Sequence, residues 1–311
     1  MTPSAQRGGR VAAVVPTLDR IDDLTRCLDA LASQKRVPDV TFVVDNGSTD
    51  GTAERVAGRD DSVQLIVTGE TLGAPGAFAL GMREAFAHGA GWVWLLDDDC
   101  VPASGALAEL LAVAASDEAA AGSAPAMEFD DGRRETGWHW GARAEGGSGQ
   151  SPNNAAGVID WAPFAGLFLR REACEQVGEV RSDWVLWHAD VEYCLRLRAA
   201  GWRLLAAPGA VVTHPTMELI ERRVLGRNVA VGRIAPWREY YDTRNLTLLR
   251  RDLRGTPFAS NTPLHRRFAE ELKRDIAVLV ADPHGARRVG MRALGRLDGL
   301  RGHMGRRPER R

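Results

Sequence analysis

The sequence of 311 residues is short of lysine and cysteine, and it has no long apolar run. Arginine carries almost all of the positive charge, because Lys35 and Lys273 are the only lysines. No apolar run approaches the roughly 18 residues that a membrane-spanning helix needs, and no apolar leader precedes Val11. We therefore expect a cytoplasmic protein that does not cross a membrane.

The cysteines form no CxxC pair and have no zinc-site spacing. We expect reduced core residues at Cys27, Cys100, Cys174 and Cys194. Two nucleotide-binding motifs are also missing. No GxGxxG follows the first predicted strand and no GxxxxGK[ST] occurs anywhere, which argues against dinucleotide-binding and P-loop enzymes.

The net charge of -1 excludes no class of partner, but the charges are unevenly distributed. Nine arginines lie between Arg287 and Arg311. Such a tail can bind an anionic membrane face or a nucleic acid, and a solvated helix with a frayed end explains it equally well. We expect no nucleic-acid partner, and peripheral membrane contact at the inner face and oligomerisation stay open.

Short apolar runs alternate with amphipathic runs in the first hundred residues. Runs typical of buried strands lie at 11–15, where Pro16 is expected to end the strand, and at 40–44, 63–67 and 92–96. Helical spacing is found at 22–32, from 53 onward and at 77–88, after a loop at 72–76. The alternation predicts a largely parallel sheet in a three-layer α/β fold.

Strands and helices continue to Pro215, and the chain beyond Pro215 predicts a helical region without strands. We expect a helix at 103–121, a strand that opens at 124–127, and a mobile loop or irregular hairpin at 130–152. A further strand is expected at 160–170, which either forms a wall of an acceptor pocket or belongs to the core. Residues 217–228 and 265–280 predict helices. The expected division is a disordered N-terminus at 1–10, an α/β domain at 11–215 and a helical region with a basic tail at 216–311.

Three consecutive acids follow the central apolar run. Asp97, Asp98 and Asp99 come directly after residues 92–96. Because ligands bind beyond the carboxyl ends of strands in open α/β sheets, we expect these acids at a ligand site. Adjacent carboxylates repel one another unless a cation or hydrogen-bond donors offset their charge, and carboxylate oxygens suit Mg²⁺ or Mn²⁺. A solvated acidic turn is the alternative, which the buried strand before it weakens.

Polar residues at other element ends are further candidates. The first two predicted strands lead into Pro16-Thr17-Leu18-Asp19 and Asp45-Asn46, where a base and a ribose could be held. Helical spacing after Asp190 places this acid near a helix N-terminus, where the dipole stabilises an ionised base. His214 ends a short predicted strand, and a lone histidine there is more often structural than a ligand.

Four motifs in this order resemble the family 2 glycosyltransferases of the GT-A fold. They are Val-Val-Pro-Thr at 14–17, Val-Val-Asp-Asn-Gly-Ser-Thr-Asp-Gly-Thr at 43–52, the triplet at 97–99 and His-Ala-Asp-Val-Glu-Tyr-Cys-Leu-Arg at 188–196. The likeness runs from Val11 to Pro215 and more weakly to Leu249. Residues 73–82, 92–96 and 241–245 look like the cell-wall galactofuranosyl- and rhamnosyltransferases. The resemblance implies a GT-A fold, a Rossmann-like three-layer sheet with a C-terminal helical appendage.

The resemblance also implies a role for each matched residue. Asp97 and Asp99 would bind Mn²⁺ or Mg²⁺, His214 would complete the metal site as in the galactofuranosyl branch, and Asp190 would be the catalytic base. Residues implied to bind the nucleotide are Pro16, Thr17, Asp19, Asp45, Gly73, Asp97 and Asp98, and those implied to bind the acceptor or sugar are Trp161, Trp187, His188 and Glu192. Trp138, Trp140, Phe164 and Trp184 could stack on sugars or belong to the core.

The implied function is an inverting, metal-dependent glycosyltransferase. It would move a sugar from a nucleotide-diphosphate donor, with UDP-galactofuranose and dTDP-rhamnose favoured, to a hydroxyl of a glycan or glycolipid such as a prenyl-diphosphate-linked glycan. The sequence departs from the family at Ala189, where an acid often precedes the base, and this leaves hydrogen bonding to the acceptor open.

Three other readings of the sequence remain. A soluble secondary-metabolite acceptor fits the same core. A nucleotidyltransferase would need cations for a triphosphate in the first strand-to-helix loop, where Arg20 is the one candidate. A silent nucleotide- or glycan-binding module would have no need of a base at Asp190.

Overall fold

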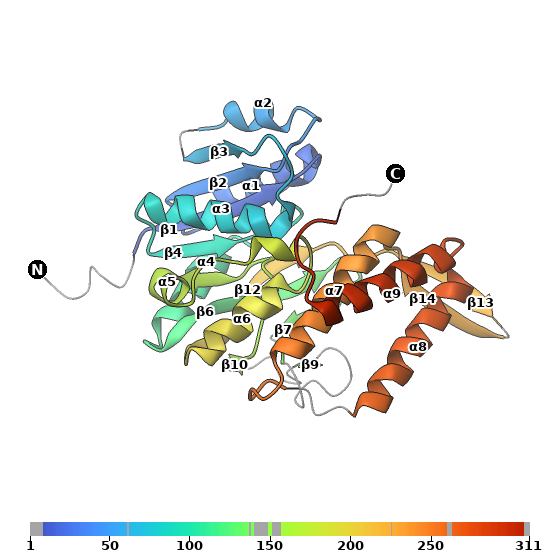
Figure 1. Ribbon diagram of the computed structural model, residues 1–311. Coiled ribbons are helices and arrows are strands. Elements are labelled where there is room, and N and C mark those ends of the chain that lie inside the picture. Colours follow the sequence, from blue (N-terminus) through green and yellow to red (C-terminus); the bar gives the residue numbers. More distant parts are fainter. Residues whose placement is uncertain are drawn as a thin grey trace, which may run out of the picture. The chain divides into compact units, whose positions relative to one another are not determined.

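The computed structural model describes residues 9–60, 62–136, 138–139, 149–150, 157–224, 226–259 and 263–307. The chain forms two compact units (Figure 1). Unit 1 comprises residues 1–139, 146–182 and 189–215, and unit 2 comprises residues 140–145, 183–188 and 216–311. Residues 1–8 of the expected disordered N-terminus lie outside what the structure describes. So do residues 137, 140–148 and 151–152 of the loop expected at 130–152, Trp140 among them, and the side chain of Trp138.

A mixed sheet of mostly parallel strands forms the centre of unit 1, as the sequence predicts. The strands β1 (Val11–Thr17), β2 (Val40–Asp45), β3 (Val63–Val67) and β4 (Trp92–Leu95) are parallel and lie in the order β4-β1-β2-β3. The sheet continues past β4 through β11 (Phe168–Arg170), β6 (Ala120–Phe129), β12 (Arg203–His214) and β10 (Val158–Ile159). β11 is antiparallel to both of its neighbours, whereas β6 and β12 are parallel to each other.

Helices on the sheet bury the apolar residues that the sequence spacing picks out. In α1 (Ile21–Ala32) the buried residues Leu24, Cys27, Leu28 and Leu31 recur at three- and four-residue intervals, which places them on one face. The other helices of unit 1 are α2 (Thr52–Ala57), α3 (Gly73–Ala87), α4 (Ala106–Ala115), α5 (Arg171–Val177) and α6 (Ala189–Ala199). α3 packs across β1 and β2 (Figure 1), where Gly81 is required because a Cβ would lie 2.3 Å from Cγ1 of Val14.

Several predicted boundaries in unit 1 are wrong. β1 continues through Pro16 to Thr17 and does not end at Pro16. The backbone groups of successive strand residues face opposite neighbours, and those of Pro16 face β4. Because the pairing of β4 with β1 ends at Val14, the missing amide hydrogen of Pro16 interrupts no pairing between strands. The expected loop at 72–76 already contains the first turn of α3. The expected helix at 103–121 ends at Ala115, because Asp117 accepts a hydrogen bond from the Ala119 amide and turns the chain into β6.

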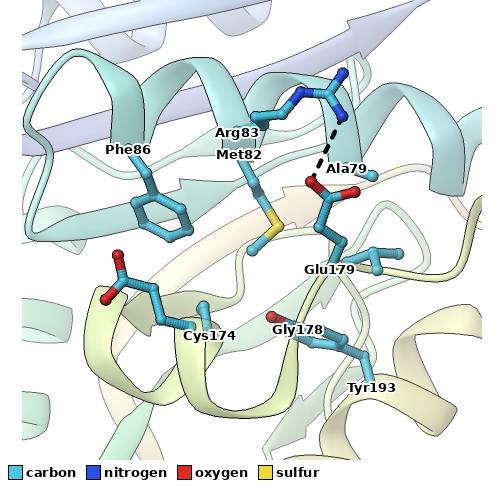
Figure 2. A pocket seen from close by; sticks show the side chains of 10 residues that line it. Ala79, Met82, Arg83, Phe86, Cys174, Gly178, Glu179 and Tyr193 are labelled. Atoms are coloured by element: carbon cyan, nitrogen blue, oxygen red, sulfur yellow. Dashed lines mark hydrogen bonds and ion pairs between the residues drawn. The ribbon is translucent and has the colours of Figure 1, made fainter.

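A cavity of about 280 Å³ lies between α3, α5 and α6 in unit 1 (Figure 2). Met82, Phe86 and Val180 give it apolar walls, and Arg83 and Glu179 lie 3.5 Å apart across it. None of the predicted site residues lines this cavity. It is therefore separate from the candidate donor site described below.

Unit 2 consists of a hairpin and three helices. The hairpin joins β13 (Leu219–Val224) to antiparallel β14 (Arg227–Gly232), and the helices are α7 (Pro236–Asp252), α8 (Leu264–Ala281) and α9 (Gly285–Arg301). The predicted helix at 217–228 is wrong, because Gly226 takes a left-handed conformation that turns the chain back, with φ of 79°. In the described part of the chain, no helix is both long and apolar enough to span a membrane.

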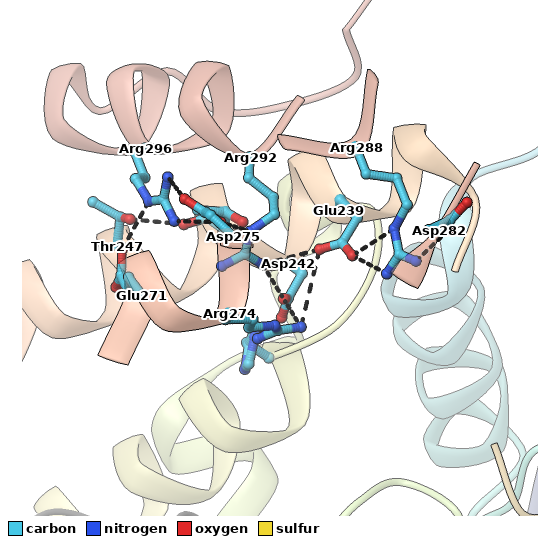
Figure 3. A network of polar contacts seen from close by, with 12 residues as sticks. Glu239, Asp242, Thr247, Glu271, Arg274, Asp275, Asp282, Arg288, Arg292 and Arg296 are labelled. Atoms are coloured by element: carbon cyan, nitrogen blue, oxygen red, sulfur yellow. Dashed lines mark hydrogen bonds and ion pairs between the residues drawn. The ribbon is translucent and has the colours of Figure 1, made fainter. Parts of the chain in front are cut away.

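Buried ion pairs join the three helices of unit 2 (Figure 3). Glu239 of α7 is fully buried and accepts hydrogen bonds from Arg288 and Arg292 of α9. Arg288 also pairs with Asp282 at 2.6 Å. These two arginines of the basic tail are therefore buried, and the interpretation of the tail as a solvated helix is wrong for them.

Candidate donor and metal site

The three consecutive acids lie directly beyond the carboxyl end of β4. The next strand, β5 (Val101–Pro102), pairs with β12 so that Val101 lies opposite Thr213. This pairing brings His214, at the end of β12, to Asp99, with 3.3 Å between Nε2 of His214 and Oδ1 of Asp99. One ligand atom from each of Asp97, Asp99 and His214 lies within 4.8 Å of the others. The structure thus brings together the three residues that the sequence comparison picked out as metal ligands.

The electrostatics of this cluster favour a bound cation. Burial, together with the nearby charge of Asp99, raises the pKa of the Asp97 carboxyl to about 7. Oδ1 of Asp99 is buried and accepts no hydrogen bond with good geometry from the described residues. Two carboxylates and an imidazole are a donor set that divalent Mn²⁺ accepts. The residues present therefore fit a divalent ion.

Asp98 does not belong to the cluster of Asp97, Asp99 and His214. Its Oδ2 accepts a hydrogen bond of 2.8 Å from the Thr17 hydroxyl, and its Oδ1 lies 3.1 Å from a guanidinium nitrogen of Arg20. Burial raises the pKa of Asp98 to about 6, although Arg20 and Thr17 act against it. Arg20 also donates to Asp99 at 2.9 Å. The sequence suggests Arg20 only as a triphosphate-binding cation of the alternative nucleotidyltransferase, and it does not predict the pairing of Arg20 with Asp98 and Asp99.

The loops after β1 and β2 hold each other in place. Oδ1 of Asp19 accepts a hydrogen bond of 2.7 Å from the Thr49 amide, and the Asp19 amide donates to the Ser48 hydroxyl at 3.0 Å. Asp45 is buried and accepts a hydrogen bond of 2.8 Å from the Ser48 amide. The predicted nucleotide residues Pro16, Thr17, Asp19 and Asp45 therefore lie at one edge of the sheet, at the carboxyl ends of neighbouring parallel strands.

Gly73 lies at the carboxyl side of the neighbouring strand β3. It begins α3 with a φ of 75°, a left-handed conformation that suits glycine. The amide before it, that of Leu72, donates to the Asn46 side chain at 2.6 Å. This hydrogen bond ties the start of α3 to the loop after β2.

Asp190 lies in the first turn of α6, as the sequence predicts. Its carboxylate accepts a hydrogen bond of 2.8 Å from the Val191 amide. Asp190 is also one of the charges that raise the pKa of Asp97, which places it near the acidic cluster within unit 1. A helix N-terminus stabilises the ionised form that a base requires.

The predicted acceptor residues are less uniform. Trp161 is half-buried in unit 1, and Glu192 is held by Arg196 in a pair of 3.0 Å one helical turn away. Two of the aromatic residues that could have stacked on sugars belong to the core, because Trp184 is fully buried and Phe164 packs against Phe78 and Tyr193. Trp187 and His188 lie in unit 2.

The segment 183–188 of unit 2 has a strained backbone. Val185, Trp187 and His188 have positive φ angles of 66°, 47° and 61°. Such angles cost roughly 1–3 kcal/mol at a residue other than glycine, and they persist only where the surroundings impose them. Side chains of α7 impose them here: the Asn245 amide donates to the carbonyls of Trp184, Leu186 and Trp187.

A carboxylate of α7 also holds His188. Nε2 of His188 lies 2.8 Å from Oδ1 of Asp242. Burial would raise the pKa of Asp242, but His188, Arg274 and Arg292 outweigh it and the pKa is lowered. We name this arrangement, in which Asp242 and Asn245 hold residues 183–188, the α7 clamp. Sequence reasoning assigned no role to either residue, because a contact across more than fifty positions leaves no local pattern.

Comparisons with known proteins identify the family of the chain and its fold. A family model described as glycosyltransferase like family 2 matches residues 8–225. Galactofuranosyltransferase GlfT1 of Mycobacterium tuberculosis is 48% identical over 91 residues, which are 29% of this chain and 30% of that protein. The chain thus matches less than a third of that relative's length. N-acetylglucosaminyl-diphospho-decaprenol L-rhamnosyltransferase of the same organism is 27% identical over 218 residues, 61% of this chain and 71% of that protein.

The fold is also found in solved structures. The mannosyltransferase PcManGT from Pyrobaculum calidifontis, solved in complex with GDP-Man and Mn²⁺, superposes with a TM-score of 0.55 at 16% identity. The superposition covers 94% of this chain and 87% of that one. This likeness shows the GT-A fold, and the family model covers more than two thirds of the sequence. The chain therefore belongs to the family 2 glycosyltransferases.

Proposed function

We propose that this protein is an inverting, metal-dependent glycosyltransferase that transfers a sugar from a nucleotide-diphosphate donor to a hydroxyl group. The observation that carries the proposal is the convergence of Asp97, Asp99 and His214 beside the carboxyl ends of β4 and β12, with Asp190 close by in the same unit. A binding module would have no need of a further acid at a helix N-terminus beside this cluster.

Each group has a chemical task in this proposal. Asp97, Asp99 and His214 would hold Mn²⁺ or Mg²⁺, which would supply Lewis-acid stabilisation to the departing diphosphate. Pro16, Thr17, Asp19, Asp45 and Gly73 would hold the nucleotide at the sheet edge, and Asp98 would support it indirectly by fixing Thr17 and Arg20.

Asp190 would remove the proton of the acceptor hydroxyl while that oxygen attacks the sugar C1 from the face opposite the leaving diphosphate. The C1–phosphate oxygen bond breaks as the new C1–oxygen bond forms, so a single displacement inverts the anomeric centre. Trp161, Trp187, His188 and Glu192 remain candidates for the acceptor or sugar, with His188 favoured because the α7 clamp fixes its ring.

The names of the relatives guide the choice of substrates. A galactofuranosyltransferase and a rhamnosyltransferase with a diphospho-decaprenol acceptor support UDP-galactofuranose or dTDP-rhamnose as the donor and a prenyl-diphosphate-linked glycan as the acceptor. We accordingly propose residues 11–215 as the catalytic domain and action at the cytoplasmic face of a membrane. A soluble secondary metabolite is the alternative acceptor.

Incubation with each donor, Mn²⁺ and a synthetic prenyl-diphosphate disaccharide tests the proposal. We expect a product heavier by one sugar, and nuclear magnetic resonance should show the inverted anomeric configuration. Retention of configuration would refute the assignment of Asp190 as a simple base. Pyrophosphate released from a nucleoside triphosphate and a sugar phosphate would instead indicate a nucleotidyltransferase, and nucleotide binding without any turnover would indicate a silent module.

A further inference from the structure

The helix α8 packs on the rest of unit 2 largely through charge. Glu271 pairs at 2.7 Å with Arg250 of α7 and at the same distance with Arg296 of α9, and Asp275 pairs with Arg292 and Arg296 (Figure 3). Only near the C-terminal end of α8 does an apolar contact take over, where Val278 and Ala281 are buried against Val231. The inner face of most of α8 is therefore ionic.

The outer face of α8 is apolar. Phe268, Leu272, Ile276 and Leu279 are separated by four, four and three residues, which aligns them on one side of the helix. Their exposed fractions are 69%, 48%, 51% and 48%. We name these four residues the α8 stripe. The stripe extends over three helical turns, or about 16 Å, and in the described parts of the chain no residue covers it.

This arrangement reverses the usual pattern of a surface helix. An amphipathic helix in a water-exposed protein turns its apolar side to the core and its charged side outward. Single exposed apolar side chains need no explanation, but a continuous row of large ones marks a surface that binds something apolar. The ion pairs on the inner face fix which side points outward, so the exposure of the stripe is built into the packing of α8.

The charges around the stripe are mainly basic. Lys273 lies next to Leu272 and three residues before Ile276, and its ammonium group pairs with Glu270 at 2.8 Å. The hairpin β13–β14 packs against α8. Arg274 belongs to the inner ion-pair network through Asp242. Two of the other exposed cations are paired, Lys273 with Glu270 and Arg233 with Glu218. The remaining exposed charges of α8 and the hairpin are Arg222, Arg223, Arg227 and Arg266 against the single acid Glu221.

We propose that the α8 stripe docks on an anionic lipid surface, with its four apolar side chains at the level of the acyl chains and the neighbouring cations among the headgroups. An apolar face beside a basic margin is the composition that interfacial helices use on anionic membranes. The proposal goes beyond the transferase activity and does not depend on it. It places membrane contact on α8 and not on the arginine tail, two of whose arginines are buried.

A second copy of the chain is a poorer occupant of the stripe. A symmetric dimer through this face would bring the same basic margin of each copy together, and like charges would oppose it. Four side chains also cover far less than the roughly 800 Å² per partner that a stable interface buries.

Sedimentation with lipid vesicles tests the proposal on the full-length protein. The probes are vesicles of phosphatidylcholine alone and vesicles of phosphatidylcholine with phosphatidylglycerol. We expect the protein to sediment with the anionic vesicles and to be released by high salt. The double variant Leu272→Gln/Ile276→Gln should bind the anionic vesicles at least about tenfold more weakly, and Lys273→Gln should bind them about fivefold more weakly.

The matched control is Val37→Gln/Val67→Gln, which removes two apolar side chains of similar exposure from unit 1. This control should bind vesicles as the unchanged protein does. Because all of these positions are exposed, the variants should melt at unchanged temperatures, so that a loss of binding is not a loss of fold. Protein that stays in the supernatant with anionic vesicles, or a stripe variant that binds as tightly as the control, would overturn the proposal.

Light scattering without lipid distinguishes the other occupant. We expect the same molar mass for the unchanged protein and for Leu272→Gln/Ile276→Gln. A dimer that the double variant dissociates would assign the stripe to a second copy and refute the lipid assignment. None of these measurements requires sugar transfer. They therefore distinguish a failure of the lipid proposal from a failure of the proposed transferase activity.

Discussion

Replacement of Asn245 by alanine should release the strained segment that carries His188. The Asn245 amide nitrogen donates to Trp184 O at 3.0 Å, to Trp187 O at 2.9 Å and to Leu186 O, and the side chain is fully buried. The variant Asn245→Ala removes the side-chain donor of the Leu186 and Trp187 carbonyls, whereas the Trp184 carbonyl keeps a hydrogen bond of 3.0 Å from Arg244. A buried carbonyl that loses its partner costs about 1–3 kcal/mol, and two donor hydrogens are lost, so we expect a loss of about 3 kcal/mol in the free energy of unfolding.

Two measurements check this prediction. Thermal unfolding should show a midpoint lowered by about 6–12 °C, since about 1 kcal/mol corresponds to roughly 2–4 °C in a chain of this size. At temperatures where the variant is still folded, the transfer rate should fall at least about tenfold, because Asp190 follows this segment after one residue and small displacements of a reacting group are costly.

The matched control is Asn228→Ala, an asparagine exposed on β14, which should change the free energy of unfolding by less than about 0.5 kcal/mol. If Asn245→Ala were as stable as this control, the strained backbone at 183–188 would not depend on the α7 clamp. A variant that loses stability but keeps the full transfer rate when folded would show that the clamp has no part in the reaction.

Three further predictions concern other parts of the chain. Asp190→Asn should abolish transfer and leave metal-dependent nucleotide binding unchanged by calorimetry, and equal loss of both would refute its assignment as base. Gly295→Ala should destabilise the packing of α7 on α9 by about 1–3 kcal/mol, because a Cβ would lie 2.4 Å from the Tyr240 carbonyl oxygen. Gly290→Ala on the same helix places its Cβ in open space and should stabilise the protein by about 0.5–1 kcal/mol. Burial acts to raise the pKa values of Asp275 and Asp282, but their arginine partners outweigh burial, and both pKa values are lowered. The stability that these ion pairs give is therefore complete above the unfolded pKa of about 4 and is lost as the pH falls below it. Melting of the protein followed between about pH 5 and pH 3 should show this loss, and a midpoint that does not fall would contradict it.

The sequence predicts the parts of unit 1 that depend on local patterns. Strands β1, β2 and β4 are buried on both faces, so their apolar runs need no other information to be recognised, whereas β3 is a partly exposed strand at the edge of the sheet. The position of Asp97 and Asp99 follows from the strand before them. The meeting of His214 with Asp99 does not follow, because it depends on the pairing of β5 with β12, which lie more than a hundred residues apart.

Unit 2 shows where sequence reasoning fails. Glu239 and Arg292 look like solvent-exposed residues of charged helices, yet they are buried as an ion pair of 3.0 Å. Their burial is decided by the packing of α7 on α9, which no window of sequence contains. The hairpin at 219–232 was missed for a different reason, because the charged strand β13 hides the alternation that β14 shows at Val229 and Val231.

The most direct test of the central claim is calorimetric titration of the protein with UDP and with dTDP, each in Mn²⁺ and in EDTA, together with the same titrations of Asp99→Asn. We predict binding of at least one of the two nucleotides in Mn²⁺, loss of that binding in EDTA and loss of it again in Asp99→Asn. Equal affinity with and without the metal, or full metal-dependent binding by Asp99→Asn, would contradict the assignment of Asp97, Asp99 and His214 as the metal site of a glycosyltransferase.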